Sequence, residues 1–261
     1  MPTQTVDSEW PGESGMSDKP IFFMHIAKTA GTSLNKVFTD AFGDAVSIHI
    51  EGKPLPWEML ESSRFVSGHV RHLVFRRISN GIDYRFITLL RDPVDHLRSH
   101  LNWVKLQTTD RRHLPFISQN APIKRLSEEL RKVNIAKPDE IRRFLDDNLD
   151  DPECVTLFEN CQTRYFIEAP ADRPLAYEDF VDAMNNMARF DFVGISEMFE
   201  ASVERLANEL DLPLNARSVR ENTTSYSRRI DRGQFRDALS DYLGYDLALY
   251  ELAKTRFLRS I

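Results

Sequence analysis

Residues 21–34, IFFMHIAKTAGTSL, combine the two patterns on which the predicted architecture depends. The first six residues form a continuous apolar run, which is typical of a parallel strand buried on both faces. After a short polar turn, apolar residues recur at helical spacing, at Leu34, Val37, Phe38 and Ala41. The stretch therefore predicts a buried strand that leads through a tight turn into an amphipathic helix.

Four further apolar runs have the length and composition of strands, at 45–50, 64–68, 84–90 and 191–195. Helices are predicted in the gaps: one opens at Asp92-Pro93, one opens at Pro138, one is capped by Ser196, and the last covers 241–257. This alternation predicts a three-layer α/β fold, in which helices cover both faces of a central, mostly parallel sheet.

Residues 20–261 are expected to form one domain, because no internal repeat or second linker interrupts them. Residues 1–19 are rich in polar residues, Gly and Pro, and are expected to form a disordered tail. Residues 105–149 are interpreted as a helical insertion. Between Lys105 and Lys137, eight basic and three acidic residues give a charge of +5, on a chain of net charge −6. We interpret this segment as a solvated helical surface, with contact to an anionic ligand or acceptor as the alternative.

The composition excludes several classes of protein. The 261 residues include 34 basic and 40 acidic ones, and this acidic balance argues against nucleic-acid binding. No apolar run reaches the ~20 residues of a membrane span, and the N-terminus lacks the basic and apolar regions of a secretory signal, so we expect a cytoplasmic location. The two cysteines, Cys154 and Cys161, are expected to be reduced apolar side chains on one helix, and no metal ligand is assigned.

The turn after the first strand has the features of an anion site. A helix that begins directly after a buried strand directs free N–H groups and the positive end of its dipole at one point. Gly31 allows the backbone to approach a ligand closely, and Lys28 adds a cation. Thr32 and Ser33 add hydroxyl donors. The spacing is not that of a Walker A loop, in which Lys directly follows the second Gly. The turn favours a phosphate, and a capped helix with a solvated lysine is the alternative.

A second candidate site follows the strand predicted at 84–90. Arg91 comes at the carboxyl end of that strand, where open α/β sheets bind ligands. Asp92 and Pro93 begin the next helix, and Ser99 lies about two turns into it. A guanidinium and a hydroxyl suit a second phosphate, and a structural ion pair of Arg91 is the alternative. Two such sites would suit a nucleotide with phosphates at both ends of its ribose.

These two segments, HIAKTAGTS (25–33) and RDPVDHLRS (91–99), resemble the signature of the sulfotransferases that use 3′-phosphoadenosine 5′-phosphosulfate (PAPS), especially the carbohydrate group that includes heparan sulfate 2-O-sulfotransferase. That family has HIPKTGGTS and RDPxxRxxS in these places. The chain departs from the pattern at Ala27, Ala30 and His96, and Arg98 is close to the position where the family has Arg. Weaker similarities are SGHV (67–70), NCQTR (160–164), residues 192–207 and the polar loop 221–229. The resemblance implies a P-loop-like version of the predicted fold.

The resemblance also implies a role for each matching position. Lys28 would bind the bridging oxygen of PAPS. Arg91 and Ser99 would hold the 3′-phosphate, and a loop containing Asn222 and Thr223 would close over the nucleotide. The 5′-phosphate would be held by Thr29, Ala30, Gly31, Thr32 and Ser33.

A histidine is the expected base. His69, in SGHV, follows a predicted strand and should lie at the same edge of the sheet, and the resemblance implies a catalytic histidine in this context. Imidazole suits proton abstraction near neutral pH. A packing role for His69 is one alternative, and other candidate bases are His72, Asp95 and His100. His25 is expected to form a structural hydrogen bond to the turn, and Arg164 would lie near the ligands or form an ion pair on a helix surface.

The sequence thus predicts an enzyme that transfers a sulfuryl group from PAPS to a hydroxyl of a carbohydrate, glycolipid or other alcohol by in-line displacement, without a required metal. Two alternatives stay open here. One is a non-catalytic nucleotide-binding protein of the sulfotransferase type. The other is a small-molecule kinase, against which the missing Walker A spacing argues.

Overall fold

Five parallel strands form a single sheet in the order β2-β3-β1-β4-β5. The structure is a computed structural model that describes residues 19–50, 57–79, 81–109, 120–168, 170, 172–215 and 231–259. Each strand lies within a run predicted from the sequence: β1 (Ile21–Met24), β2 (Val46–Ile50), β3 (Phe65–Gly68), β4 (Arg85–Leu90) and β5 (Phe192–Ile195). Every residue of β1 and β3 is buried, because both faces of the sheet are covered.

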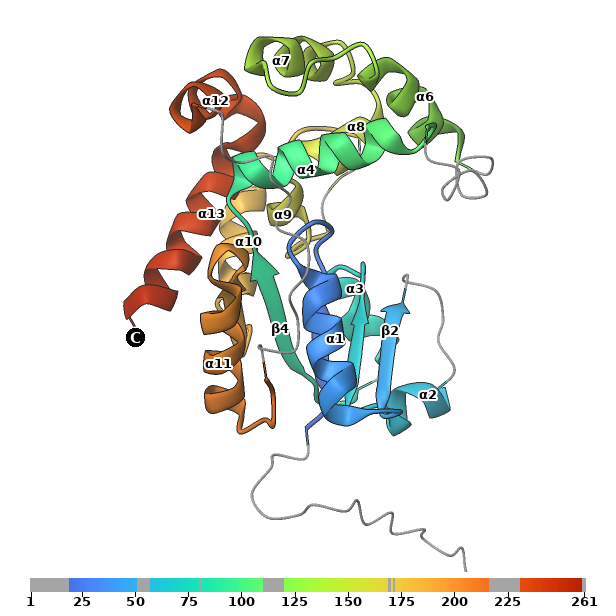
Figure 1. Ribbon diagram of the computed structural model, residues 1–261, viewed down its shortest axis with the longest axis vertical. Coiled ribbons are helices and arrows are strands. Elements are labelled where there is room, and N and C mark those ends of the chain that lie inside the picture. Colours follow the sequence, from blue (N-terminus) through green and yellow to red (C-terminus); the bar gives the residue numbers. More distant parts are fainter. Residues whose placement is uncertain are drawn as a thin grey trace, which may run out of the picture.

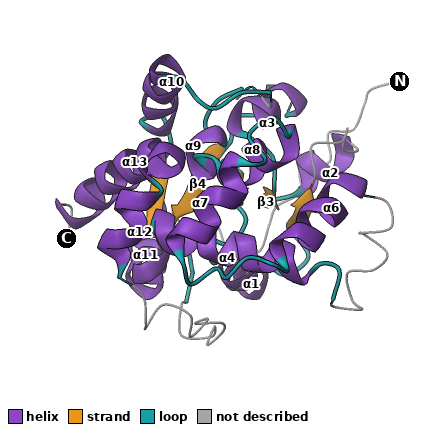
Figure 2. Cartoon of the chain, turned by 90° about the horizontal axis from the view of Figure 1, so that it is seen from above, coloured by secondary structure: helices purple, strands orange, loops and turns teal. Residues whose placement is uncertain are grey.

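Helices cover both faces of this sheet, as predicted. In Figures 1 and 2, α1 (Gly31–Phe42) and α11 (Phe199–Leu210) lie on one face, and α3 (His72–Ile78) and α10 (Tyr177–Met187) lie on the other. The short α2 (Trp57–Ser62) lies near the foot of β2. The predicted apolar stripe of α1 is buried against the sheet at Leu34, Val37 and Phe38. The observed core is therefore that of a three-layer α/β protein.

The chain leaves β1 and β3 on opposite faces of the sheet. From β1 it enters α1 on one face, and from the neighbouring β3 it enters α3 on the other face. The two exits therefore diverge at the carboxyl ends of adjacent strands. In open parallel sheets such a divergence opens the crevice in which ligands bind.

A layer of helices lies above the carboxyl ends of the strands (Figure 1). We call it the helical layer; it consists of α4 (Pro93–Leu106), α6 (Ala121–Leu130), α7 (Pro138–Asp146), α8 (Pro152–Phe158), α9 (Cys161–Arg164) and α12 (Arg232–Ala238). The predicted insertion, 105–149, contains α6 and α7, and its residues 110–119 lie outside the described residues. The layer is larger than predicted, because α4, α8 and α12 share its apolar core through Leu101, Phe158 and Phe235.

The last helix, α13 (Ser240–Arg259), joins the two apolar cores. Its first turn buries Tyr242 and Leu243 in the helical layer, and Leu249 and Phe257 farther along the helix are buried with the sheet. Among the described helices, α13 included, none combines the length and apolar character that crossing a membrane requires.

Two local predictions are wrong. Ser196 does not cap a helix: it starts the 3₁₀ turn η2 (Ser196–Met198), and α11 begins at Phe199 without a side-chain cap. Cys154 and Cys161 lie on two helices rather than one, because Asn160 adopts a left-handed conformation (φ 43°) that ends the run between α8 and α9. Both cysteines are buried and free, as predicted. The predicted tail, 1–19, falls outside the described residues except for Lys19.

Candidate functional site

The turn between β1 and α1, residues 25–30, alternates in backbone hand. Lys28 and Ala30 are left-handed, with φ of 69° and 67°, although neither is glycine. Alternation of this kind brings successive N–H groups onto one concave side, which makes an anion-binding nest. Within the described residues, the N–H groups of Thr29, Ala30, Gly31 and Thr32 donate to no protein acceptor. The turn therefore presents a set of donors in front of the positive end of α1.

The carbonyl groups of residues 26–29 in this turn are each held by a side chain. Three of the four donors come from outside the turn: Arg91 directly follows β4, His96 lies on α4 and Ser196 lies in η2. The bonds join Thr29 Oγ1 to Ile26 O (2.8 Å), His96 Nε2 to Ala27 O (2.8 Å), Arg91 Nη1 to Lys28 O (2.9 Å) and Ser196 Oγ to Thr29 O (2.8 Å). Because these side chains engage the carbonyl oxygens on one side of the turn, the backbone N–H groups remain available on its concave side.

Lys28 and Arg91, the two cations predicted from separate motifs, belong to one site. The guanidinium of Arg91, which directly follows β4, donates to the carbonyl of Lys28. Burial lowers the pKa of Lys28, and the neighbouring charge of Arg91 lowers it further. Both effects disfavour a charged Lys28 in the free protein, and a bound polyanion would reverse them.

Gln162 fixes the backbone of Arg91 from the helical layer. Its Oε1 accepts from Arg91 N (2.9 Å) and its Nε2 donates to Arg91 O (2.9 Å), while the side chain is fully buried. Asp246 on α13 holds α9 in place by accepting from the N–H groups of Gln162 (3.1 Å) and Thr163 (2.7 Å). Gln162 lies within NCQTR, one of the weaker similarities, but no sequence pattern predicted its role.

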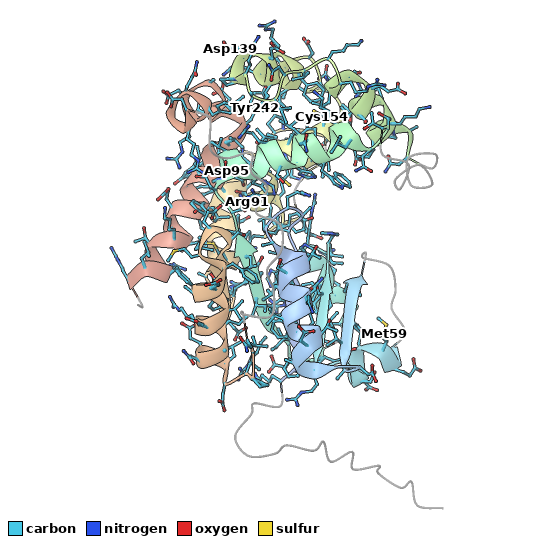
Figure 3. All side chains as sticks on the ribbon, in the orientation of Figure 1. Met59, Arg91, Asp95, Asp139, Cys154 and Tyr242 are labelled. Atoms are coloured by element: carbon cyan, nitrogen blue, oxygen red, sulfur yellow. The ribbon has the colours of Figure 1, made fainter. Side chains whose placement is uncertain are left out.

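The start of α4 is anchored by acidic residues. Asp92 caps the helix, as predicted, by accepting from Val94 N (3.0 Å) and Asp95 N (3.2 Å). Arg236 of α12 pairs with Asp92 (3.1 Å), and Arg232 pairs with Asp95. Figure 3 shows Arg91 and Asp95 where the sheet meets the helical layer. Ser99 is half-buried one turn beyond Asp95 on α4. No sequence motif indicated the two arginines of α12.

His69 occupies the adjacent strand exit, after β3. Its exposed imidazole lies against that of His25, with ring centroids 4.3 Å apart, and its Nδ1 is 2.7 Å from His25 O. A carbonyl oxygen can only accept, so Nδ1 carries the hydrogen and Nε2 carries the lone pair. The hydrogen bond thus fixes the tautomer that a general base requires.

The packing of His25 requires a glycine at position 31. A Cβ at this position would lie 2.0 Å from the ring of His25, so Gly31 makes room for the imidazole that supports His69. This packing gives the His25 ring a structural role, whereas the expected hydrogen bond from its side chain to the turn stays a prediction. At Ala30, where the family has glycine, the backbone is left-handed, so this departure places a Cβ in a conformation that favours glycine.

Two arginines lie away from the turn. Arg98 does not replace the family's Arg: its guanidinium lies over Phe235 (5.4 Å) and its Nε donates to Ile135 O (3.3 Å) within the helical layer. Arg164 forms no surface ion pair. It is fully buried and pairs with buried Glu159, so its role is structural.

The other candidate bases are less suited than His69. Burial lowers the pKa of His72 to about 4, and it lowers that of His100 well below the ordinary value. Asp95 is engaged by Arg232. Asn222 and Thr223, expected to close over a nucleotide, lie outside the described residues.

The chain matches no protein-family model, and it has no similar sequence among curated proteins. Its function must therefore be inferred from the site itself. The arrangement joins a nest of N–H donors, two adjacent cations and a histidine with a defined lone pair. Chemically, it can bind a phosphorylated ligand and accept a proton beside it.

Proposed function

We propose that this protein is a PAPS-dependent sulfotransferase that acts on a hydroxyl acceptor. The observation that carries the proposal is the bond from Arg91 to the carbonyl of Lys28, which joins the two motif segments at one rim of the sheet. His69 lies at the neighbouring strand exit, where the chain diverges. A donor nucleotide with two phosphates and an adjacent base is the chemistry that this combination favours.

In the proposed complex the turn binds the 5′-phosphosulfate. The N–H groups of residues 29–32 and the hydroxyls of Thr32 and Ser33 face the phosphate, and Lys28 lies at the bridging oxygen. Arg91, its backbone held by Gln162, binds the 3′-phosphate together with Ser99. Desolvation of Lys28 makes its charge more effective on a bound anion than it would be in water.

The proposed chemical step is an in-line displacement at sulfur. The acceptor oxygen forms a bond to sulfur while the bond from sulfur to the bridging phosphate oxygen breaks, which leaves adenosine 3′,5′-bisphosphate. His69 Nε2 takes the proton of the acceptor hydroxyl. Lys28 offsets the negative charge that develops on the departing oxygen, and the oriented N–H groups contribute in the same way. The proposed acceptors are hydroxyls of carbohydrates, glycolipids or other alcohols.

A ligand-dependent melting experiment tests the nucleotide part of the proposal. At 100-fold the dissociation constant, adenosine 3′,5′-bisphosphate should raise the melting temperature by roughly 5–10 °C, since a ligand that binds the folded state stabilises it by mass action. Lys28→Ala should abolish the increase, whereas Lys36→Ala, which removes an exposed lysine of α1, should retain it. A larger shift with ATP and Mg²⁺, or none with either ligand, would refute the proposal.

A second measurement tests the transfer itself. The protein is incubated with PAPS carrying labelled sulfate and with a panel of glycans, glycolipids, phenols and simple alcohols. Label should enter at least one hydroxyl acceptor, and the Lys28→Ala variant should lose this activity. Binding of the bisphosphate without transfer to any acceptor would favour the non-catalytic alternative.

A further inference from the structure

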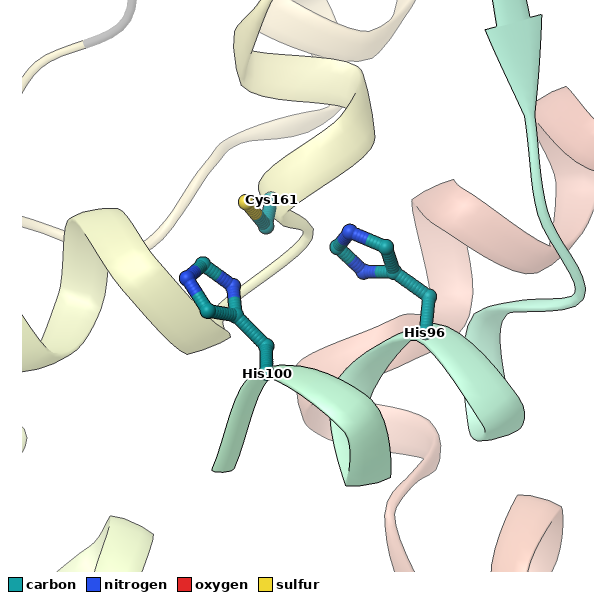
Figure 4. A group of neighbouring side chains, drawn as sticks. All are labelled: His96, His100 and Cys161. Carbon is teal, nitrogen blue, oxygen red and sulfur yellow. The ribbon is translucent and has the colours of Figure 1, made fainter. Parts of the chain in front are cut away.

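Three buried side chains of the helical layer form a cluster that the proposed transfer does not use. His96 and His100 are four residues apart on α4, so they share one face of the helix, and Cys161 opens α9 opposite them. One potential ligand atom of each lies within 4.8 Å of the other two. Figure 4 shows the two imidazoles side by side with the sulfur of Cys161 facing them.

Hydrogen bonds fix which ring nitrogens are free. His96 donates from Nε2 to Ala27 O (2.8 Å), which leaves the lone pair on Nδ1. His100 is hydrogen-bonded to the backbone of Leu157, and its buried Nδ1 has no partner. Histidines that bind metals usually donate their other N–H to a backbone carbonyl or carboxylate in this way, because the bond sets both the tautomer and the ring orientation.

We propose that His96, His100 and Cys161 form a site for a borderline-soft transition-metal ion such as Zn²⁺, with His96 Nδ1, His100 Nδ1 and Cys161 Sγ as ligands. Two imidazoles and one thiolate form a donor set that suits such ions rather than Mg²⁺ or Ca²⁺. Binding forms two metal–nitrogen bonds and one metal–sulfur bond, and the thiol proton of Cys161 passes to the solvent.

The geometry needs only a small contraction. One ring nitrogen of each histidine and Cys161 Sγ lie within 4.8 Å of one another, and three atoms so spaced have a common point within about 2.8 Å of each. Zinc requires about 2.0–2.1 Å to nitrogen and about 2.3 Å to sulfur, so each ligand must move inward by less than about 1 Å. Rotation of the three side chains can supply such a movement without moving α4 or α9.

The surroundings of the cluster favour metal binding in one respect and oppose it in two. Burial lowers the pKa of His96 to about 4 and that of His100 well below its ordinary value, so both rings are neutral, as ligands must be. Burial raises the pKa of the Cys161 thiol, so the metal has to displace a firmly held proton. The charge of Lys28 is close enough to lower the pKa of both histidines, and it opposes a cation too. Lys28→Ala should therefore bind the metal more tightly.

An ion at this site would tie the turn to the helical layer. His96 holds the carbonyl of Ala27, and Cys161 precedes Gln162, which holds the backbone of Arg91. The metal would thus connect His96, which holds the turn beside Lys28, with the start of α9, where Gln162 holds Arg91. It would not contact the sulfuryl donor. Its role is structural, and it is independent of whether the protein transfers sulfate.

Cobalt provides a direct spectroscopic test on the full-length chain. The reduced protein is freed of metal with a chelator and titrated with Co²⁺. The wild-type protein should bind one Co²⁺ ion and show a charge-transfer absorption band from the Cys161 thiolate to cobalt. Cys154→Ser removes the other buried cysteine and should keep the band, whereas Cys161→Ser should lose it. His100→Gln should weaken cobalt binding at least tenfold.

Circular dichroism and melting of each variant establish that it is folded. If Cys161→Ser does not fold, His100→Gln provides the same test. No thiolate band in wild type would overturn the proposal, and so would a band that persists in folded Cys161→Ser. Zinc competition for the bound Co²⁺ gives the affinity for Zn²⁺.

Discussion

The tautomer of His69 controls the chemistry open to this site. A hydrogen bond of 2.7 Å to His25 O places the proton on Nδ1 and the lone pair of the neutral ring on Nε2. Gly31 supports this arrangement indirectly, since any side chain there would displace the ring of His25. His25 and Gly31 from the exit of β1, and His69 from the exit of β3, thus together define the position of one lone pair.

We expect His69→Asn to separate the chemistry from the binding. The amide of asparagine can still donate to His25 O, but it cannot accept a proton as a base. Turnover should therefore fall about 10²–10⁴-fold, while the affinity for adenosine 3′,5′-bisphosphate is unchanged. Steady-state rates and calorimetric titration measure the two quantities. Full turnover in this variant would show that His69 is not the base.

Ala30→Gly should stabilise the protein. Ala30 has φ 67°, a conformation that costs little for glycine, so the free energy of unfolding should increase by about 0.5–1 kcal/mol. Ala41→Gly in the same helix provides the control, because a helical alanine loses about 1 kcal/mol when it is replaced by glycine. Urea denaturation should show shifts of opposite sign, and a destabilised Ala30→Gly would contradict this account.

Among the helices, α4 links the site to the helical layer. Asp92 caps it and pairs with Arg236, and the next residue toward the N-terminus, Arg91, touches the turn. The direction in which α4 leaves β4 therefore sets the position of the guanidinium. A substitution at the start of α4 should therefore alter the affinity for adenosine 3′,5′-bisphosphate, even where the substituted residue touches no ligand.

The Asp92→Ala variant tests whether the start of α4 positions Arg91, and the Asp151→Ala variant is its matched control. Both residues cap a helix that begins with proline, and both pair with an arginine. Each substitution should cost about 0.5–2 kcal/mol of stability. The affinity for adenosine 3′,5′-bisphosphate should decrease in Asp92→Ala alone. Equal affinities in the two folded variants would show that the start of α4 does not position Arg91.

The molecule as a whole is held together by α13, which contributes to both apolar cores. On this helix, fully buried Asp246 accepts from the backbone at the start of α9, and burial raises its pKa to about 6. The unfolded chain has the ordinary value, near 4. The folded protein therefore binds a proton more readily than the unfolded chain between about pH 4 and pH 6.

This difference between the pKa of Asp246 in the folded and unfolded states makes a testable contribution to the free energy of unfolding. The contribution from protonated Asp246 is fully present below about pH 4, and it is lost as the pH rises through about 6, by roughly 2–3 kcal/mol. Asp246→Asn does not titrate, so the unfolding free energy of wild type should decrease relative to this variant over that interval. Urea denaturation at several pH values measures the difference, and a constant difference would contradict the raised pKa.

Sequence patterns predicted the strands well, because a strand buried on both faces requires an uninterrupted apolar run, such as 21–24. They also placed Lys28 and Arg91 at strand ends. The support of the site could not be predicted, since Gln162 and Arg236 reach it from 71 and 144 residues away in the sequence. The error at Ser196 has the same cause: its hydroxyl bonds Thr29 across the fold rather than its own helix.

The four donors that hold the turn also fix when it can form during synthesis. Thr29, Arg91 and His96 leave the ribosome early, but the fourth donor, Ser196, follows β5, some 165 residues after the turn. A nascent chain that ends before β5 already contains Lys28 and Arg91. It still lacks Ser196, whose hydroxyl holds the carbonyl of Thr29. The turn is therefore held by all four side chains only late in translation, when about three quarters of the polypeptide is already made.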